Sequence, residues 1–208
     1  MLRIARRVSR VNGFTLIELL VVVSIIGILA ALGFSGANAA MKKSQMAECL
    51  SNMRQVGVAM QLFVGDNSGA LPGTSHGTSW TNSLSDYLNT NFIGRCPCFP
   101  KHRAKVTYGW NDSLASSGPG VQMVSCRTPS STMAVAELAT NQSSEHFHFM
   151  GGRGGAAGVT ANQFKVAVNV QAHGKTANYL FVDGHAENLT WIEVQRRLSQ
   201  PNSTFLVP

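Results

Sequence analysis

The sequence predicts an α+β protein in which one long N-terminal helix packs on an antiparallel β-sheet. Three observations lead to this prediction. An uncharged, apolar run occupies residues 19–41, an apolar stripe with helical spacing continues beyond it, and short strand-like segments fill the C-terminal half. Because the helical pattern comes first and the strands follow without alternating helices, an antiparallel sheet is expected rather than a parallel one.

The apolar run is long enough to cross a membrane, since about 20 apolar residues span a bilayer as a helix. A cleaved secretory signal has a shorter apolar core, followed by a small-residue cleavage site. Ala37, Ala39 and Ala40 lie at the far end of the run and leave signal-peptidase cleavage open as an alternative. We expect the segment to be kept as a transmembrane helix.

The basic excess is concentrated at the N-terminus. The formal net charge is +7, and the first ten residues hold four arginines, Arg3, Arg6, Arg7 and Arg10. Without them 13 basic residues face 10 acidic ones, a balance of +3 that is ordinary for a domain of this size. A nucleic-acid partner is therefore not expected. Positive charge stays in the cytoplasm, so we expect the N-terminus inside and the C-terminal domain outside.

A carboxylate lies at the start of the apolar run. Glu18 is the fifth residue after Gly13, within the segment Gly-Phe-Thr-Leu-Ile-Glu-Leu-Leu-Val-Val of residues 13–22. A lone carboxylate in lipid is costly unless it is paired or reaches the interface. The combination of Gly, Phe, Thr and Glu at this spacing resembles the type IV prepilin signature, which type IV pilins and type II secretion pseudopilins share.

The resemblance implies a processing site and an assembly residue. A prepilin peptidase would cleave after Gly13, N-methylate Phe14 and leave the apolar segment as the core of a filament. Glu18 would pair with the terminal amine of a neighbouring subunit. A carboxylate and an ammonium attract strongly in low dielectric, and each alone would be costly there. The implied partners are the peptidase, other copies of the chain or related pilins, and the membrane.

The organisation that follows is a leader at 1–13, a transmembrane and assembly helix at 14–40, and an extracytoplasmic, pilin-like globular domain at 41–208. The helix is expected to continue to Val64, which makes it about 75 Å long. Asp66-Asn67-Ser68-Gly69 indicates its end. The stripe that would lie on the domain comprises Met46, Leu50, Met53, Gly57, Met60 and Val64.

The remaining elements are predicted from turn and capping signals. A short helix begins at Trp80, with Ser79 or Thr78 as its cap. A capping box at Thr190-Trp-Ile-Glu predicts a last helix over 191–199. Asp183-Gly184 predicts a two-residue type I′ hairpin turn. The predicted strands are 106–111, 121–125, 132–137, 164–170, 179–182 and 185–189.

A second resemblance lies near the C-terminus. His173 is followed by nine residues and then by Asp183-Gly184, which looks like the H-X9-DG region of proteins that also carry prepilin signatures. His173, Asp183 and His185 are residue types that bind divalent metals. We expect a structural role instead, in which Asp183 and Gly184 make the turn and His173 bonds nearby backbone. No metal and no other cofactor is expected.

The chain has four cysteines, Cys49, Cys96, Cys98 and Cys126. The last three, together with His102, could in principle hold zinc, but their spacing is not that of a common zinc module. An exported location favours disulfides. Cysteines two residues apart rarely bridge each other, so we expect a disulfide between Cys126 and either Cys96 or Cys98.

The predicted function is that of a structural subunit of a type IV pilus-like or type II secretion pseudopilus-like filament. It would be a single-pass protein of the inner membrane, or part of a periplasmic or surface filament. The alternative is a membrane-tethered extracytoplasmic binding protein that uses the prepilin pathway without forming a filament. No catalytic arrangement of Ser, His, Asp or Cys is recognisable in the sequence, so an enzyme is not expected.

Overall fold

The computed structural model describes residues 13–73, 79–88, 95–99, 106–115, 121–140, 142, 144–147, 149 and 159–207. The chain separates into two compact units, one ending at Met41 and the other beginning at Lys42. Helix α1, Leu16–Asp66, contributes to both units. The expected long N-terminal helix is therefore present.

Within the described residues, the N-terminal unit is the first part of α1 with the three residues before it, and its described apolar side chains are exposed. Leu16 is 81 % and Ile28 is 62 % exposed. An 18-residue window of this helix has a mean hydropathy of 2.7, so it is long and apolar enough to cross a membrane by length and composition. Exposed apolar surface of this extent needs lipid or protein to cover it.

The second unit is built on a five-stranded sheet in the order β3-β1-β2-β4-β5. Neighbouring strands are antiparallel, except that β1 and β3 are parallel. The strands are β1 Tyr108–Asn111, β2 Met133–Glu137, β3 His146–Phe147, β4 Thr176–Phe181 and β5 Ala186–Thr190. The predicted α+β class with a mostly antiparallel sheet is confirmed.

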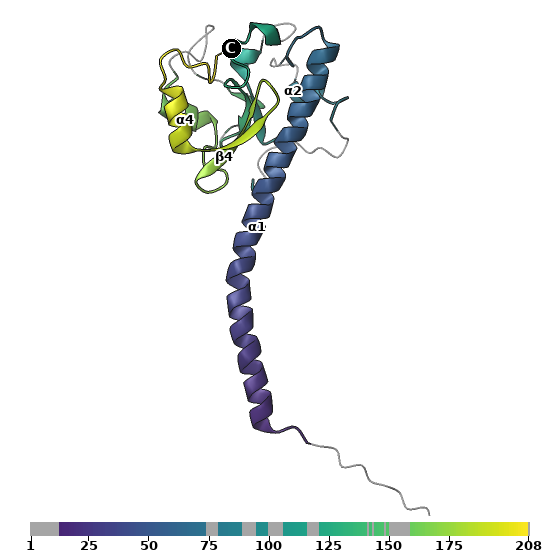
Figure 1. Ribbon diagram of the computed structural model, residues 1–208, viewed down its shortest axis with the longest axis vertical. Coiled ribbons are helices and arrows are strands. Elements are labelled where there is room, and N and C mark those ends of the chain that lie inside the picture. Colours follow the sequence, from purple (N-terminus) through teal and green to yellow (C-terminus); the bar gives the residue numbers. More distant parts are fainter. Residues whose placement is uncertain are drawn as a thin grey trace, which may run out of the picture. The chain divides into compact units, whose positions relative to one another are not determined.

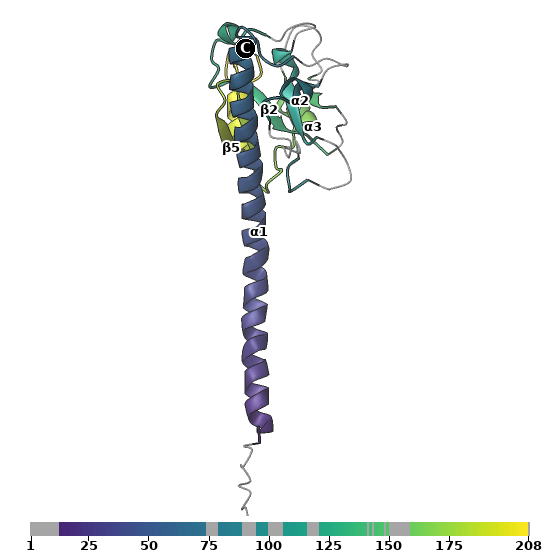
Figure 2. The same cartoon turned by 90° about the vertical axis from the view of Figure 1, so that its right-hand side faces the viewer.

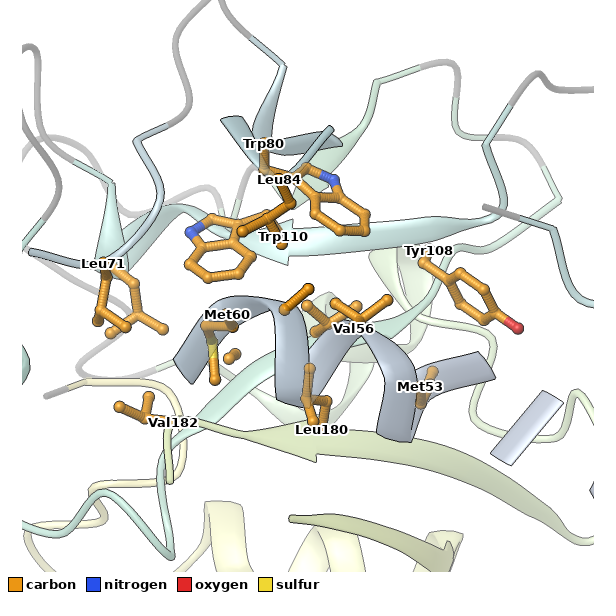
Figure 3. Packing of buried hydrophobic residues seen from close by; sticks show 14 of the residues in the cluster. Met53, Val56, Met60, Leu71, Trp80, Leu84, Tyr108, Trp110, Leu180 and Val182 are labelled. Atoms are coloured by element: carbon orange, nitrogen blue, oxygen red, sulfur yellow. The ribbon is translucent and has the colours of Figure 1, made fainter. Parts of the chain in front are cut away.

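One face of the sheet is covered by the second part of α1. Met53, Val56 and Met60 of α1 are buried there. They pack among Trp110 of β1 and Leu180 of β4, as Figure 3 shows. The predicted apolar stripe thus lies on the sheet. The short helix α2, Trp80–Ser83, and the 3-10 helix η1, Asp112–Leu114, add to the same core.

The other face is covered by helices α3, Ala161–Ala167, and α4, Trp191–Leu198. In Figure 1, α4 and the second part of α1 flank strand β4 from opposite sides, and in Figure 2 the second part of α1 passes in front of the strands. Phe164 of α3 and Val194 of α4 pack with Phe181 and with Phe205 of the C-terminal segment. Strands β1, β2 and β4 are therefore buried on both faces, whereas β5 is only partly buried.

Two predicted strands are wrong. Residues 121–125 contain the 3-10 helix η2, Met123–Ser125, and only Gln122 bridges to Ala70. Residues 164–170 belong mostly to α3, because Thr160 and Gln163 form a capping box that starts a helix. Val166, which the alternating pattern placed in a strand, is 59 % exposed on this helix.

The turn between β4 and β5 also differs from the prediction. It is a three-residue loop, in which Gly184 N donates to Phe181 O at 2.9 Å and Phe181 N donates to His185 O at 2.9 Å. Gly184 has φ +89°, whereas Asp183 does not have positive φ. A three-residue hairpin loop needs positive φ only at its last residue, which here is Gly184, whereas a two-residue type I′ turn needs it at both residues. The Asp183 carboxylate accepts from His185 N at 3.1 Å and supports the loop.

Helix α1 approaches this turn closely at Gly57. A Cβ atom on Gly57 would lie 2.4 Å from Gly184 O and 2.9 Å from Leu180 Cδ1. Alanine normally favours a helix over glycine by about 1 kcal/mol. We nevertheless expect Gly57→Ala to lower the free energy of unfolding by about 2 kcal/mol, because the backbone contact must give way. Chemical denaturation of detergent-solubilised protein, followed by tryptophan fluorescence, measures it.

Gly65 of the same helix is the matched control. A Cβ atom there would meet nothing within 4 Å. Gly65→Ala should therefore leave the free energy of unfolding unchanged or raise it by up to about 1 kcal/mol. Equal effects of the two substitutions would contradict the close contact between α1 and the turn.

Candidate functional site

The first candidate site is the start of α1. Gly13 and Phe14 precede the helix and are exposed. Thr15 N and Thr15 Oγ1 donate to Glu18 Oε2 at 2.9 Å and 2.6 Å, and Glu18 N donates to Thr15 Oγ1 at 3.3 Å. These bonds form a capping box, which sequence reasoning missed although Thr-x-x-Glu is its usual pattern. The Glu18 carboxylate thus has partners within its own chain.

The second candidate site is a buried carboxylate–imidazole pair. Glu137, the last residue of β2, is 0 % exposed. His173 Nε2 lies 2.6 Å from Glu137 Oε1, and the His173 side chain is 2 % exposed. Asn178 N donates to Glu137 Oε2 at 3.0 Å, so both carboxylate oxygens have partners. Asn178 Nδ2 lies 3.0 Å from His173 Nε2.

The sheet itself brings these groups together. Side chains two residues apart on a strand share a face, so Glu137 lies on the same face as Val135, and Asn178 on the same face as Leu180. Val135 and Leu180 belong to the core under α1. Strands β2 and β4 are neighbours. The buried pair therefore lies on the face of the sheet that α1 covers.

His173 does not make the side-chain contact that the sequence predicted. Its backbone N donates to Thr176 O at 3.0 Å, but its ring contacts the Glu137 carboxylate rather than nearby backbone. Glu137 was missed as a site residue. The sequence offered one signal for this site, a single Glu at the end of an apolar strand. Such a Glu is equally typical of a strand end that reaches solvent, so the signal did not identify a buried carboxylate.

The cysteine prediction is wrong. The disulfide joins Cys49 and Cys96, and Cys98 and Cys126 are thiols. Cys49 lies on the buried stripe of α1, and Cys96 N donates to Thr107 Oγ1 at 2.6 Å, which fixes the 95–99 segment beside the start of β1. The two Cα atoms are 5.1 Å apart, within the usual range for a disulfide. Burial raises the pKa of the Cys126 thiol.

The disulfide and the buried pair are neighbours. Cys49, Cys96, Cys98 and His173 each offer a ligand atom within 4.8 Å of the others. Three thiolates and one imidazole would suit zinc, but a disulfide sulfur is not a thiolate. The oxidised cluster therefore offers only Cys98 and His173. Cys126 is not in this group, and His102, considered as a zinc ligand from sequence, lies outside the described residues.

The other two metal candidates lie at the β4–β5 turn. His185 Nδ1 is 2.6 Å from Asp183 Oδ1, and both side chains are partly exposed. The His185 ring stacks on Phe181 with centroids 4.4 Å apart. Among the described residues, His173, Asp183 and His185 do not form a common metal-ligand group.

Residues 8–34 match the family model of the prokaryotic N-terminal methylation motif. The matched segment includes the exposed Gly13 and Phe14, the Thr15–Glu18 capping box and the first part of α1. No curated protein and no solved structure matches the chain significantly. The motif implies a pilin-like protein that a prepilin peptidase processes, and it points to a structural subunit rather than an enzyme. The H-X9-DG resemblance stays a prediction.

Proposed function

We propose that this pilin-like protein is a structural subunit of a type IV pilus-like or type II secretion pseudopilus-like filament. The methylation motif over residues 8–34 carries the proposal. The peptidase removes residues 1–13 on the cytoplasmic side of the inner membrane and methylates the new amine of Phe14. The apolar first part of α1 anchors the subunit and then packs with the same helix of its neighbours. The globular domain stays outside the membrane.

In this proposal Glu18 has two roles. Within its own chain it accepts hydrogen bonds from Thr15 and begins α1. Between chains its charge attracts the methylated ammonium of Phe14 on a neighbouring subunit, because both charges lie in low dielectric. The attraction neutralises two costly charges at once and sets the stagger between subunits.

The capping box also supports the alternative, a membrane-tethered binding protein without a filament. A carboxylate that is already bonded to Thr15 N and Oγ1 needs no neighbouring subunit to justify its place in the sequence. The two functions therefore differ in whether the charge of Glu18 is needed, or only its hydrogen bonding.

Processing is tested by the mass of the mature protein. We expect the N-terminus to be Phe14, so that the chain is lighter by residues 1–13 and heavier by one methyl group. Gly13→Leu should leave the leader attached, because a large side chain then occupies the cleavage position. Intact-mass spectrometry of the membrane fraction reads both results. A terminus at Met1 or near Ala40 in the wild type would refute the processing.

Assembly is tested by two substitutions of Glu18 that separate charge from capping. Glu18→Gln keeps the capping pattern, because Gln can replace Glu in a capping box, but removes the charge. Glu18→Leu removes both. If the charge pairs subunits, both variants should lose most of the sheared surface or periplasmic filament, whereas membrane-bound protein persists. Thr15→Val, which removes the capping hydroxyl and keeps the charge, is the control and should assemble.

Other outcomes decide against parts of the proposal. Normal filament yield in Glu18→Gln with loss in Glu18→Leu would assign Glu18 to helix capping alone. Wild-type cells that contain processed protein but no filament, even when the protein is overproduced, would favour the tethered binding protein.

A further inference from the structure

A free thiol lies next to the disulfide that ties α1 to the 95–99 segment. The sulfurs of Cys49, Cys96 and Cys98 and a ring nitrogen of His173 all lie within 4.8 Å of one another. Cys98 is not in a disulfide and is partly exposed. Its thiol donates to Gln45 Oε1 of α1 at 3.7 Å. The thiol therefore faces the same helix that carries Cys49.

The environment of Cys96 suits a leaving group. Its Sγ lies 3.9 Å from His173 Nε2. The imidazole is in turn fixed by the buried carboxylate of Glu137, at 2.6 Å. A sulfur released from the disulfide would thus appear beside a ring that can carry a proton, and such a neighbour stabilises a thiolate.

We propose that Cys98 and the Cys49–Cys96 disulfide form a thiol–disulfide exchange site, so that α1 is tied to the 95–99 segment through either Cys96 or Cys98. The Cys98 thiolate attacks Sγ of Cys49. The Cys98–Cys49 bond forms as the Cys49–Cys96 bond breaks, and the electron pair leaves on Cys96. The proton lost from Cys98 ends on Cys96 or on the His173 imidazole. No external oxidant or reductant takes part.

Attack on Cys49 is favoured over attack on Cys96. Bridging Cys96 to Cys98 would join cysteines separated by one residue, which strains the disulfide geometry. Attack on Cys49 instead places the departing sulfur next to His173. Helix α1 remains covalently tied to the same segment in both disulfide isomers, so the core under α1 need not open.

The surroundings of Cys98 set the pH dependence of the exchange. Burial raises the pKa of the Cys98 thiol, and the charges of Glu137 on β2 and Glu48 on α1 raise it further. Tyr108 of β1 also faces this thiol, and its own pKa is raised by burial, so its hydroxyl stays neutral. His173 faces the cluster beside Cys96. Since the thiolate is the nucleophile, exchange should be slow at neutral pH and faster as pH rises.

The test maps free thiols in the full-length, detergent-solubilised protein. The protein is purified without reductant at pH 6, held at pH 8.5, returned to pH 6 and labelled with N-ethylmaleimide. Reduction and a second label follow. Cys96 and Cys98 share a tryptic peptide, so fragment-ion spectra must locate the first label. We expect it on both Cys96 and Cys98 after the pH 8.5 step, and Cys96→Ser protein should form a Cys49–Cys98 disulfide.

Matched variants complete the test. Cys98→Ser should leave Cys96 without the first label, whereas Cys126→Ser, which removes the thiol outside the cluster, should change nothing. The proposal would be overturned if the first label in the wild type is found on Cys98 but never on Cys96. It would also be overturned if Cys49 carries a free thiol in the Cys96→Ser protein. The wild type purified without reductant could also retain one equivalent of zinc, with Cys49, Cys96 and Cys98 all protected from the first label. That result would overturn the proposal and make the cluster a metal site.

Discussion

Replacing His173 with alanine should lower the free energy of unfolding by about 4 kcal/mol, because it leaves the buried carboxylate of Glu137 without its imidazole partner. Glu137 is 0 % exposed, and the contact between Glu137 Oε1 and His173 Nε2 is 2.6 Å long. Chemical denaturation followed by fluorescence of the buried Trp80 and Trp110 measures the change.

A double-mutant cycle isolates the pair. Glu137→Gln alone should also destabilise, but it should reduce the effect of His173→Ala, since no buried charge then remains unpaired. Asp183→Asn is the contrasting variant from the same sequence motif. Its partner His185 is partly exposed, so the change should stay below about 1 kcal/mol. An effect of His173→Ala as small as that of Asp183→Asn would show that the buried pair does not stabilise the domain.

Replacing Cys49 with serine should lower the free energy of unfolding by about 4 kcal/mol in the chain-entropy description of disulfides. The disulfide with Cys96 has a sequence separation of 47, so its loss frees a long loop in the unfolded chain. The measurement compares oxidised wild-type protein with Cys49→Ser by denaturation without reductant.

Cys126→Ser is the control for that comparison, because Cys126 is a buried thiol outside the disulfide. It loses no covalent link and should cost much less than Cys49→Ser. Adding reductant should bring the wild type down to the stability of Cys49→Ser and leave that variant unchanged. A wild type that does not respond to reductant would contradict the stabilising disulfide.

The features predicted correctly from sequence depend on local patterns. The apolar run and the stripe at three- and four-residue steps were sufficient to predict α1, because side-chain periodicity is set by helix geometry alone. The start of α4 followed from Thr190, whose hydroxyl accepts from Glu193 N at 3.3 Å. The Gly-Phe-Thr-Leu-Ile-Glu segment likewise sufficed to identify the methylation motif, because the residues of this motif are contiguous in the sequence.

Where the sequence was misread, a local pattern had two meanings. Residues 164–170 alternate like a strand, yet the capping box at Thr160 and Gln163 made a helix of them. Asp183-Gly184 signals a turn, but the number of loop residues depends on how β4 and β5 pair. The capping box resolved the first case, and the register of β4 and β5 resolved the second.

The amino-acid sequence by itself determined the N-terminal motif, the long helix and the α+β class. Only the tertiary structure decided which cysteines pair and what His173 contacts. Cys49 meets Cys96 because α1 lies on the sheet face beside the 95–99 segment, and His173 meets Glu137 because β2 and β4 are neighbours. These contacts join residues 47 and 36 positions apart, and no local signal encodes such a distance.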